Sequence, residues 1–380
     1  MALYKYFLKR LALTIPTLLG VSIIVFLLIH MIPGDPIDIM LGDRVTEAAR
    51  LALEERLGLN EPLHIQYWQW FTSALRGDFG ISIRSNQPVM EEILTRLPAT
   101  IELTVVALII AVIFGIYFGV SAARYRNTLI DQSLIGFSLL GVSIPIFWLG
   151  MMLIYLFAVM LGWLPVSGRL SMGVTIPACT GLYLIDSLIA GHMGSFIDSV
   201  KHLLMPAVSL ATVSLALVVR VTRSSMLDVL SEDYIRTARA KGVQESKVVY
   251  THALKNAMIP VVTVVGLQLA KLMGGAILTE TVFSWPGIGR LLVTAINVRD
   301  YPVVQGVVFF VAFAFIAINI IVDLIYAFPE TGFKPCRQIN LYRIVRSYTG
   351  TDYSQDYQQN GDEKCHNSQP VAFVDPYNLI

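Results

Sequence analysis

The stretch EDYIRTARAKGVQESKVVYTHALKNAMIP, residues 232–260, is rich in charge and yet lies between two long apolar runs. Its first part consists of good helix formers, which predicts a helix over 231–241 with Ser231 as its N-cap. Gly242 then favours a helix stop in the left-handed conformation. A second short helix, about 245–257, is predicted to lead directly into the next apolar run. The stretch therefore predicts a charged helical hairpin between two apolar helices.

The composition of the whole chain explains why those flanking runs are so long. The chain has 380 residues, of which 55% are hydrophobic and only 14% are charged. Soluble domains carry about 25% charged residues, so this balance indicates a membrane protein. The net charge of +1 gives no sign of nucleic-acid binding. The three cysteines form no CxxC pair, which argues against a zinc site, another metal site or a disulfide scaffold.

The apolar runs predict an all-α polytopic membrane protein with six transmembrane helices. A span needs about 20 apolar residues to cross about 30 Å of hydrocarbon. The first run is too long for a signal peptide and is interpreted as a retained span. A seventh candidate, 178–191, is short and contains Asp186, so an interfacial or re-entrant helix is the better interpretation. The predicted spans are roughly 11–32, 101–123, 134–161, 204–222, 258–280 and 303–328.

Basic residues predict the orientation, because Lys and Arg accumulate in cytoplasmic segments. The segments that share a side with the N-terminus carry most of them, and the loops near 162–203 and 281–302 carry few. The N-terminus and the C-terminus are therefore both expected in the cytoplasm. The residues counted on the cytoplasmic side are Lys5, Lys9, Arg10, Arg124, Arg126, Arg220, Arg223, Arg236, Arg239, Lys241, Lys247 and Lys255.

The chain divides into three predicted parts. Residues 1–98 comprise the first span and a small extracytoplasmic lobe. Residues 99–328 form the membrane core of five spans, with the charged hairpin in a cytoplasmic loop over 223–257. Residues 329–380 are polar and lack periodicity, so disorder is the expectation for this tail.

Sequence motifs for catalysis are missing. The sequence contains no GxxxxGK[ST], no HExxH and no GxSxG, and no carboxylates cluster at membrane depth. A catalytic role is therefore not expected, and energy for transport would have to come from a gradient or from a partner protein.

Lys271 is an ionisable residue near the middle of the fifth span. A lipid-facing ammonium there would cost about 2.5–3.5 kcal/mol on insertion scales. Two interpretations remain open: the side chain lines a water-filled pathway, or it forms an ion pair between helices or reaches toward the interface. The adjoining pair Gly274-Gly275 favours close helix packing over substrate binding. The pathway-lining candidates at helical spacing are Thr263, Gln268, Lys271, Gly275 and Thr279.

The charged hairpin also allows two interpretations, a positive-inside loop that happens to be helical or a docking element for a cytoplasmic partner. TARAKG and HALKNAMIP resemble the cytoplasmic loop of binding-protein-dependent ABC importer permeases, in which Glu-Ala-Ala precedes a glycine and Ile-x-Leu-Pro follows it. Ala238, Gly242 and Leu254 keep the residue types of that motif.

A closer resemblance is to the first permease subunit of dipeptide and oligopeptide importers, where EDYIRTARAKG is the usual form. It extends from Met1 to about Phe328, and LIDSLIAG (184–191) favours the dipeptide branch. The tail beyond Phe328 departs from the family, whose members end soon after the last span. The other matching blocks are HMIPGDP (30–36), GDFGIS (77–82), PATIEL (98–103), SIPIFWLGMML (143–153), LPVSGR (164–169), VRVTRSSMLDVL (219–230), ILTETVFSWPGIGR (277–290) and RDYPVVQG (299–306).

The resemblance implies a type I ABC importer transmembrane domain in a bacterial inner membrane. Its implied partners are a second homologous permease, two cytoplasmic ATPase subunits that bind ATP and Mg²⁺, and a periplasmic peptide-binding protein; this chain itself would bind no cofactor. A coupling helix, about Val243–Lys255, would contact an ATPase subunit. The contact residues this implies are Arg236, Ala238, Arg239, Gly242, Val243, Glu245, Ser246, His252 and Leu254.

Dipeptides are the expected cargo, and oligopeptides, nickel and haem precursors are the alternatives on the same scaffold. A gradient-driven secondary transporter is the alternative from a different class. That class predicts inverted repeats and paired acids within the membrane, and neither is visible in the sequence.

Overall fold

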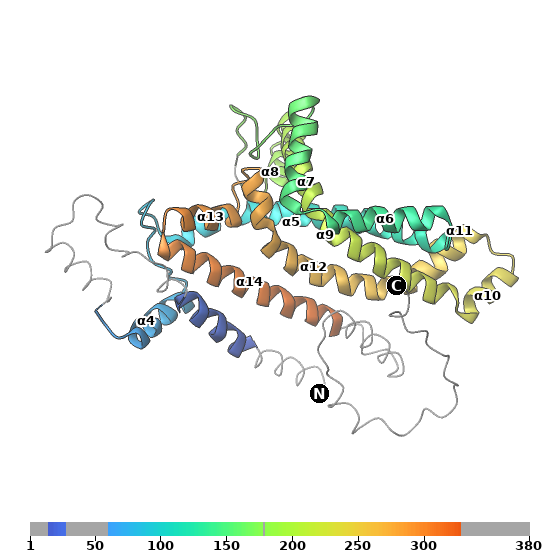
Figure 1. Ribbon diagram of the computed structural model, residues 1–380, viewed down its shortest axis with the longest axis horizontal. Helices are drawn as coiled ribbons and strands as arrows, with labels where there is room; N and C mark the ends of the chain where they lie inside the picture. The colour runs from blue at the N-terminus through green and yellow to red at the C-terminus, as the bar shows by residue number, and fades with distance from the viewer. Residues whose placement is uncertain (1–13, 28–59, 178, 328–380) are drawn as a thin grey trace, which may run out of the picture. The chain divides into compact units, whose positions relative to one another are not determined.

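The computed structural model describes residues 14–27, 60–177 and 179–327, and this part of the chain is mostly helical, with its longest loops at 76–88 and 161–182 (Figure 1). Its one β-type contact is an isolated bridge between Ile81 and Pro88. The prediction of an all-α protein is thus confirmed. The described residues belong to one compact unit, Met1–Phe328, whereas the predicted tail at 329–380 lies outside them.

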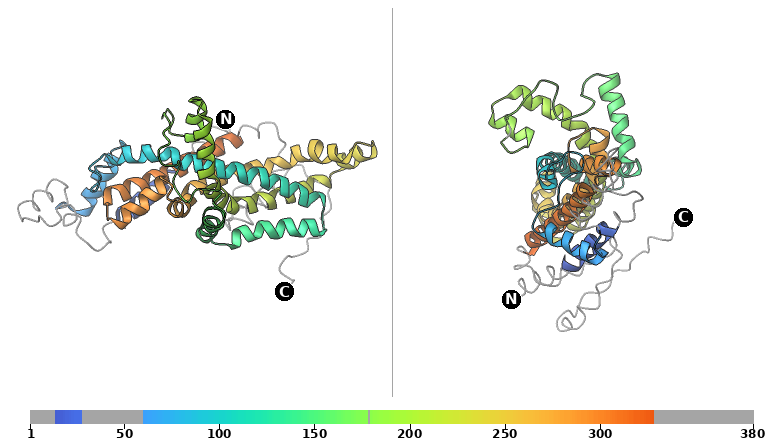
Figure 2. Two further views of the ribbon diagram at one scale, coloured as in Figure 1. Left: turned by 90° about the horizontal axis from the view of Figure 1, so that it is seen from above. Right: turned by 90° about the vertical axis from the view of Figure 1, so that its left-hand side faces the viewer.

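Among the residues that the structure describes, four helices are long and apolar enough to cross a membrane, or up to five if one bent pair counts as a single span. Figures 1 and 2 show the long helices running roughly along one axis. They extend beyond the predicted apolar windows because their polar ends stay helical. The long helices are α5 (Val89–Arg124), α9 (Met193–Leu230), α12 (Leu254–Val282) and α14 (Tyr301–Ala327).

The predicted third span, 134–161, corresponds to two apolar helices joined by a sharp bend. Helix α6 (Leu129–Ser143) is followed by α7 (Ile146–Leu153) and a π-helical turn η2 (Ile154–Met160), and the two parts are bent by 102°. Ile144 has an extended backbone, as expected for a residue before a proline. Pro145 therefore ends one helix and starts another instead of merely kinking a span.

The first predicted span, 11–32, is described only over the helix Thr14–Leu27. Its inner face is buried at Ser22, Val25 and Phe26. The hydroxyl groups of Ser22 and Tyr67 lie 2.8 Å apart, which joins this helix to α4 (Leu63–Leu75). Because the remainder of the span lies outside the described residues, the count of six spans stays a prediction.

Helices α5 and α9 pack closely because two glycines on α5 face side chains of α9. A Cβ at Gly115 would lie 2.6 Å from Cγ1 of Val218, and a Cβ at Gly119 would lie 2.5 Å from Cβ of Thr222. Such distances leave no room for a side chain. The sequence GIYFG is therefore a small-xxx-small contact of the kind that brings membrane helices together.

The predicted extracytoplasmic lobe packs on α14 through aromatic rings. Phe71 of α4 meets Phe309 edge to face, with ring centroids 6.4 Å apart, and Phe79 meets the same ring at 6.2 Å. Gly306 lets the lobe approach, since a Cβ there would lie 2.7 Å from Cγ1 of Val89. The predicted boundary at residue 98 falls inside α5, so that helix belongs to the lobe at one end and to the core at the other.

The segment 178–191 contains only a short helix, α8 (Tyr183–Ile189). Seven residues rise about 10 Å, far less than a bilayer needs. Asp186 is buried and accepts hydrogen bonds from the backbone of Thr180 and Gly181. This carboxylate therefore organises the loop that precedes α8.

Candidate functional site

The charged hairpin begins where α9 ends. Ser231 Oγ donates to the carbonyl of Asp228, so Ser231 closes α9. The prediction that Ser231 is the N-cap of the next helix is therefore wrong. That helix, α10 (Asp233–Ala240), follows Glu232, whose backbone is extended. The short hydroxyl side chain reaches back to its own helix rather than forward. The predicted helix at 231–241 is thus confirmed with slightly narrower bounds.

Gly242 ends α10 in the left-handed conformation, as the sequence predicts. Its φ is +76°, its N–H donates to Arg239, and the N–H of Val243 donates to Ala238. These two bonds are the pair that defines a Schellman cap. A Cβ at Gly242 would meet nothing within 4 Å. Backbone conformation alone, and not lack of space, therefore favours glycine here.

The second half of the hairpin is not a separate short helix. A three-residue segment, α11 (Glu245–Lys247), continues through the π-helical turn η3 (Val248–Ala253) into α12 (Leu254–Val282). The predicted direct connection to the fifth span is confirmed, and the helix predicted at Val243–Lys255 is present from Glu245 onward as the first part of that continuous run. The short separate helix of the hairpin is α10, which precedes Gly242 (Figure 1).

A small apolar core holds α10 against the ends of the long helices. Ile235 is fully buried and shares a cluster with Val248 and Val249 of η3, Val120 of α5 and Met226 of α9. Burying a side chain of this size contributes about 1.5–3 kcal/mol. Helix α10 therefore follows any displacement of η3 and α12 as part of the same packed body.

Polar contacts on the outside of the hairpin close it further. The guanidinium of Arg239 donates to both carboxylate oxygens of Glu245, at 3.1 and 2.8 Å, and Asn256 donates to the hydroxyl of Tyr234 at 2.8 Å. Both members of the ion pair are more than 40% exposed, so the pair adds little stability. Its geometric effect is to fix the turn on both sides of Gly242.

The predicted ATPase-contact residues fall into two groups in the structure. One group faces outward and the other packs toward the apolar core of the hairpin. The partner role of both groups stays a prediction. Exposed are Arg236, Arg239, Gly242, Glu245 and His252, half-buried are Ala238, Val243, Ser246 and Leu254, and Ala238, Val243 and Leu254 contact the core.

The predicted pathway residues of α12 do not share one environment. Lys271 is exposed and Thr263 is half-buried, whereas Gln268 and Thr279 are buried at 4% and 2% exposure. Gly275 lies on α12, and its burial is outside what the structure describes. The face that carries Lys271 instead includes the exposed residues Leu267, Gly274 and Leu278. A pathway role for the five residues remains a prediction.

The predicted close packing at Gly274 does not occur within the described chain, because a Cβ there meets nothing within 4 Å. The surface around it is thus open in the single subunit.

Sequence reasoning missed a buried polar cluster around Glu280. The hydroxyl of Thr100 donates to one oxygen of this carboxylate at 2.7 Å, and the backbone N–H of Arg290 donates to the other at 3.0 Å. The same threonine oxygen accepts from the N–H of Ile288 at 2.9 Å. One fully buried side chain therefore joins α5, α12 and the start of α13 (Ile288–Asn297).

A second missed cluster holds the loop before α8. Arg169 forms an ion pair with Glu102 of α5, and both side chains are at most 7% exposed. Its guanidinium lies 3.6 Å from the ring centroid of Tyr183. Glu102 also accepts the N–H of Leu184 at 2.7 Å. The acid and the base come from segments 67 residues apart, and a single glutamate in an apolar helix was the one sequence signal available.

Two further buried aspartates join segments in the same way. Asp300 accepts from the hydroxyl of Ser82 at 2.6 Å and from the N–H of Arg84 at 3.2 Å, which connects the GDFGIS and RDYP blocks. Asp131, at the start of α6, accepts two bonds from Arg223 of α9, at 2.8 and 2.7 Å. Several of the sequence blocks are thus sites where a buried carboxylate fixes one segment on another.

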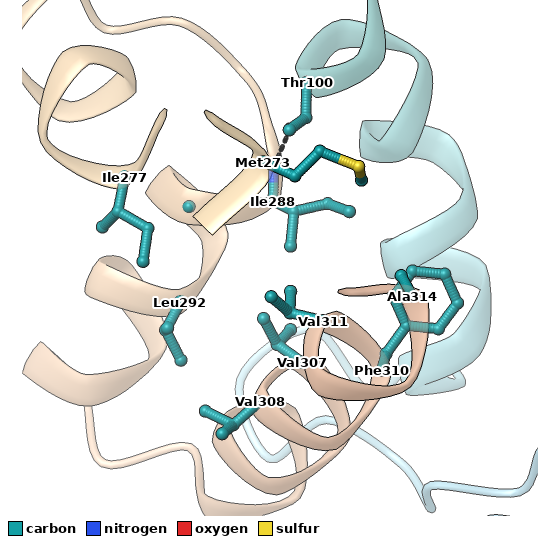
Figure 3. A pocket seen from close by; sticks show the side chains of 11 residues that line it. Thr100, Met273, Ile277, Ile288, Leu292, Val307, Val308, Phe310, Val311 and Ala314 are labelled. Carbon is teal, nitrogen blue, oxygen red and sulfur yellow. Dashed lines mark hydrogen bonds between the residues drawn. The ribbon is translucent and has the colours of Figure 1, made fainter. Parts of the chain in front are cut away.

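A cavity between α12, α13 and α14 is apolar and small (Figure 3). Its volume is about 150 Å³, below the roughly 300–1,000 Å³ of pockets that enclose organic ligands. The hydroxyl of Thr100, the polar group near it, is already bonded to Ile288, as the dashed line in Figure 3 shows. The cavity therefore offers no site for a charged peptide. Its lining includes Met273, Ile277, Leu292, Val307, Phe310 and Val311.

Long apolar helices, a rigid charged hairpin between two of them and a glycine-capped turn define an integral membrane transport subunit. Comparison with known families supports this class. Residues 111–334 match the model of the binding-protein-dependent transport system inner membrane component, and residues 3–104 match the N-terminal model of the same membrane components. The chain belongs to this family. It is a multi-pass inner-membrane permease subunit of a binding-protein-dependent transport system.

Individual relatives resemble nearly the whole membrane part of the chain. The dipeptide transport system permease protein of Alkalihalophilus pseudofirmus is 50% identical over 329 residues, 87% of this chain and 99% of the relative. Its counterpart from Escherichia coli K12 is 51% identical over 326 residues, 85% and 96% of the two chains. A glutathione transport system permease protein of Salmonella paratyphi A is 44% identical over 323 residues, 85% and 96%.

Proposed function

We propose that the chain forms half of the translocation pathway of an ATP-driven importer of dipeptides. Permeases named for dipeptide transport are about 50% identical to it over most of its length. A permease named for glutathione transport is also similar, at 44% identity, so the subunit scaffold itself tolerates different small peptides. Selection of the cargo would then rest chiefly with the periplasmic binding protein that delivers it.

The proposed assembly contains a second, homologous permease and two cytoplasmic ATPase subunits, which bind ATP and Mg²⁺. The chain would place its N-terminus and C-terminus in the cytoplasm. The distribution of basic residues supports this orientation, because it puts α10, the turn at Gly242 and the end of α5 on the cytoplasmic side. The surface offered to an ATPase subunit is then the exposed side of the hairpin.

The observation that carries the proposal is the packing of α10 onto the helical run 245–282. Ile235 is fully buried against Val248 and Val249, and no break separates these residues from α12. A displacement imposed on α10 by an ATPase subunit therefore moves the cytoplasmic end of α12. That end is mechanically connected to Lys271, which is exposed on the same helix.

The second permease would complete the pathway. The cavity between α12, α13 and α14 is too small and too apolar for a peptide. Lys271 and its neighbours on α12 are exposed in the single subunit and therefore available to face a partner across a shared passage. An ammonium there would attract the carboxylate of a passing peptide.

Co-purification tests the ATPase contact. Arg236 is exposed on α10, with only a 3.5 Å contact to Asp233, so Arg236→Glu changes the surface without opening the core. We expect this variant to lose the ATPase subunits during purification while the two permeases stay associated. Arg220→Glu is the matched control, since Arg220 is an exposed arginine on α9 outside the hairpin. Full retention of the ATPase subunits by Arg236→Glu would contradict docking on this face.

A further inference from the structure

A second cavity lies beside the hairpin and is lined by arginines. It has a volume of about 240 Å³ and lies between the end of α5, the end of α9 and the start of α11. Arg124, Arg126 and Arg239 line it together with a single acid, Glu245. The apolar part of its wall is formed by Ala123, Leu227, Leu230 and Val249.

The charges of this cavity do not balance. Glu245, which is bonded to Arg239 and also attracts Arg124, is the one acid among three arginines, so the lining carries a net positive charge. Arg124 lies 5.4 Å from the ring centroid of Tyr125. Arg126 is within electrostatic reach of Asp131, but that carboxylate is already bonded to Arg223, and Arg126 forms no ion pair with any residue that the structure describes. Arg124 is in the last turn of α5, where a cation is favoured by the helix dipole, but Arg126 lies beyond the helix and has no such role. Converging guanidinium groups of this kind are suited to an anion with several oxygens.

The position of the cavity selects the kind of anion. It lies at the ends of two long apolar helices, and part of its wall is apolar. Leu129 and Ile130, three and four residues beyond Arg126, are exposed at 80% and 49% and offer apolar surface close to it in the chain. Basic pockets at the cytoplasmic ends of membrane helices are suited to anionic lipid head groups. A phosphate diester could meet the arginines while its acyl chains follow this apolar surface.

The geometry points to a binding site for the phosphate head group of an anionic phospholipid, formed by Arg124, Arg126 and Arg239. This inference rests on the cytoplasmic placement of the hairpin in the proposed function. The bound lipid joins the end of α5 to the turn between α10 and α11. It therefore stabilises the attachment of the hairpin to the helix bundle, and binding should make coupling depend on the lipid composition of the membrane.

The test uses the complete importer in nanodiscs of phosphatidylcholine, with and without phosphatidylglycerol. Native mass spectrometry counts the phosphatidylglycerol molecules that stay bound after release from the disc. Removal of each guanidinium should lower the affinity roughly fivefold, so Arg124→Gln with Arg126→Gln should remove the retained lipid. Arg220→Gln removes one positive charge from α9 outside the cavity and should retain it.

Three outcomes would overturn the site. Equal loss of lipid in Arg220→Gln would indicate attraction by bulk charge alone. A site for free phosphate would be indicated if excess inorganic phosphate displaced the retained lipid and bound equally well in discs with and without phosphatidylglycerol. Loss of the ATPase subunits from the double variant with lipid retention unchanged would indicate that an acidic side chain of that partner occupies the cavity. ATP-driven uptake into phosphatidylcholine proteoliposomes tests the proposed function separately from lipid binding.

Discussion

Glu280 occupies the space that a side chain at Gly287 would need. A Cβ added at Gly287 would overlap the carboxylate, which is fully buried and bonded to Thr100. Gly287 has φ −98°, a value open to any residue, so the requirement for glycine is steric and not conformational. The turn SWPGIGR is therefore shaped around a buried acid that joins α5, α12 and α13.

Gly287→Ala should destabilise the permease because neither the rigid turn nor the bonded carboxylate can move without losing hydrogen bonds. Overpacking of this kind costs about 1–3 kcal/mol. A lower midpoint of thermal unfolding for the purified subunit in detergent would show it. Gly274→Ala is the matched control, since its Cβ meets nothing within 4 Å and alanine favours a helix. An unchanged midpoint for Gly287→Ala would mean that the turn relaxes freely.

The ion pair of Asp131 and Arg223 should respond unequally to the loss of either partner. The side chain of Asp131 is 3% exposed, whereas that of Arg223 is 25% exposed. Arg223→Gln removes the ion-pair partner of a buried carboxylate and leaves the N–H of Asn127 as its remaining hydrogen-bond donor, with a cost of up to about 3–5 kcal/mol. Asp131→Asn leaves a guanidinium that water can reach, so its cost should be smaller.

Unfolding midpoints of the two single variants and of the double variant form a mutant cycle for this pair. The double variant Asp131→Asn with Arg223→Gln should be more stable than Arg223→Gln alone, because no unpaired buried charge remains. Arg220→Gln, on the same helix, controls for the loss of one positive charge. Equal effects of the two single variants would show that burial does not set the cost.

The loop before α8 should become unstable in acid because of Asp186. Burial would raise the pKa of this carboxyl, but hydrogen bonds from Thr180 and Gly181 outweigh it, and the pKa is lowered in the folded protein. A lowered pKa means that the aspartate stabilises the fold above its unfolded pKa of about 3.9, and this contribution is lost as the pH falls further.

Limited proteolysis with an acid-tolerant protease measures this dependence. The range from about pH 3 to pH 6 is chosen because it brackets the ordinary aspartate pKa of about 3.9. Cleavage within 163–192 should rise below about pH 4 in the natural chain. Asp186→Asn should be cleaved at every pH, because an amide replaces one acceptor oxygen with a donor. Identical pH profiles for the two proteins would assign the acid sensitivity to another group.

The sequence predicted those features whose cause is local. Gly242 follows a run of helix formers, and the left-handed cap follows from that pattern alone. The size of the bend at Pro145 could not be predicted, because the residues on both sides are equally apolar and hydropathy does not tell in which direction a helix runs. Ser231 was assigned to the wrong helix because its hydroxyl can bond either way along the chain.

The buried polar clusters could not be predicted because their members are far apart in the chain. Thr100 and Glu280 are separated by 180 residues, and Asp131 and Arg223 by 92. Each member alone looks like a polar residue near the end of an apolar run. The split of the predicted α12 face has a related cause, since helical spacing places Gln268 and Lys271 near each other but cannot tell which side faces the bundle.

Lys271→Gln should reduce peptide uptake while leaving assembly and ATP hydrolysis unchanged. The ammonium is exposed on α12, where a passing carboxylate would gain about 1 kcal/mol in a water-filled passage, or roughly fivefold in uptake at low peptide concentration. Uptake of a labelled dipeptide into proteoliposomes that contain the full importer and its binding protein measures the effect. Lys271→Arg keeps the charge and should transport normally, and Lys201→Gln removes an exposed charge from α9. If Lys271→Gln transports as well as the natural chain, the side chain does not face the pathway and instead serves packing or pairing with a partner helix.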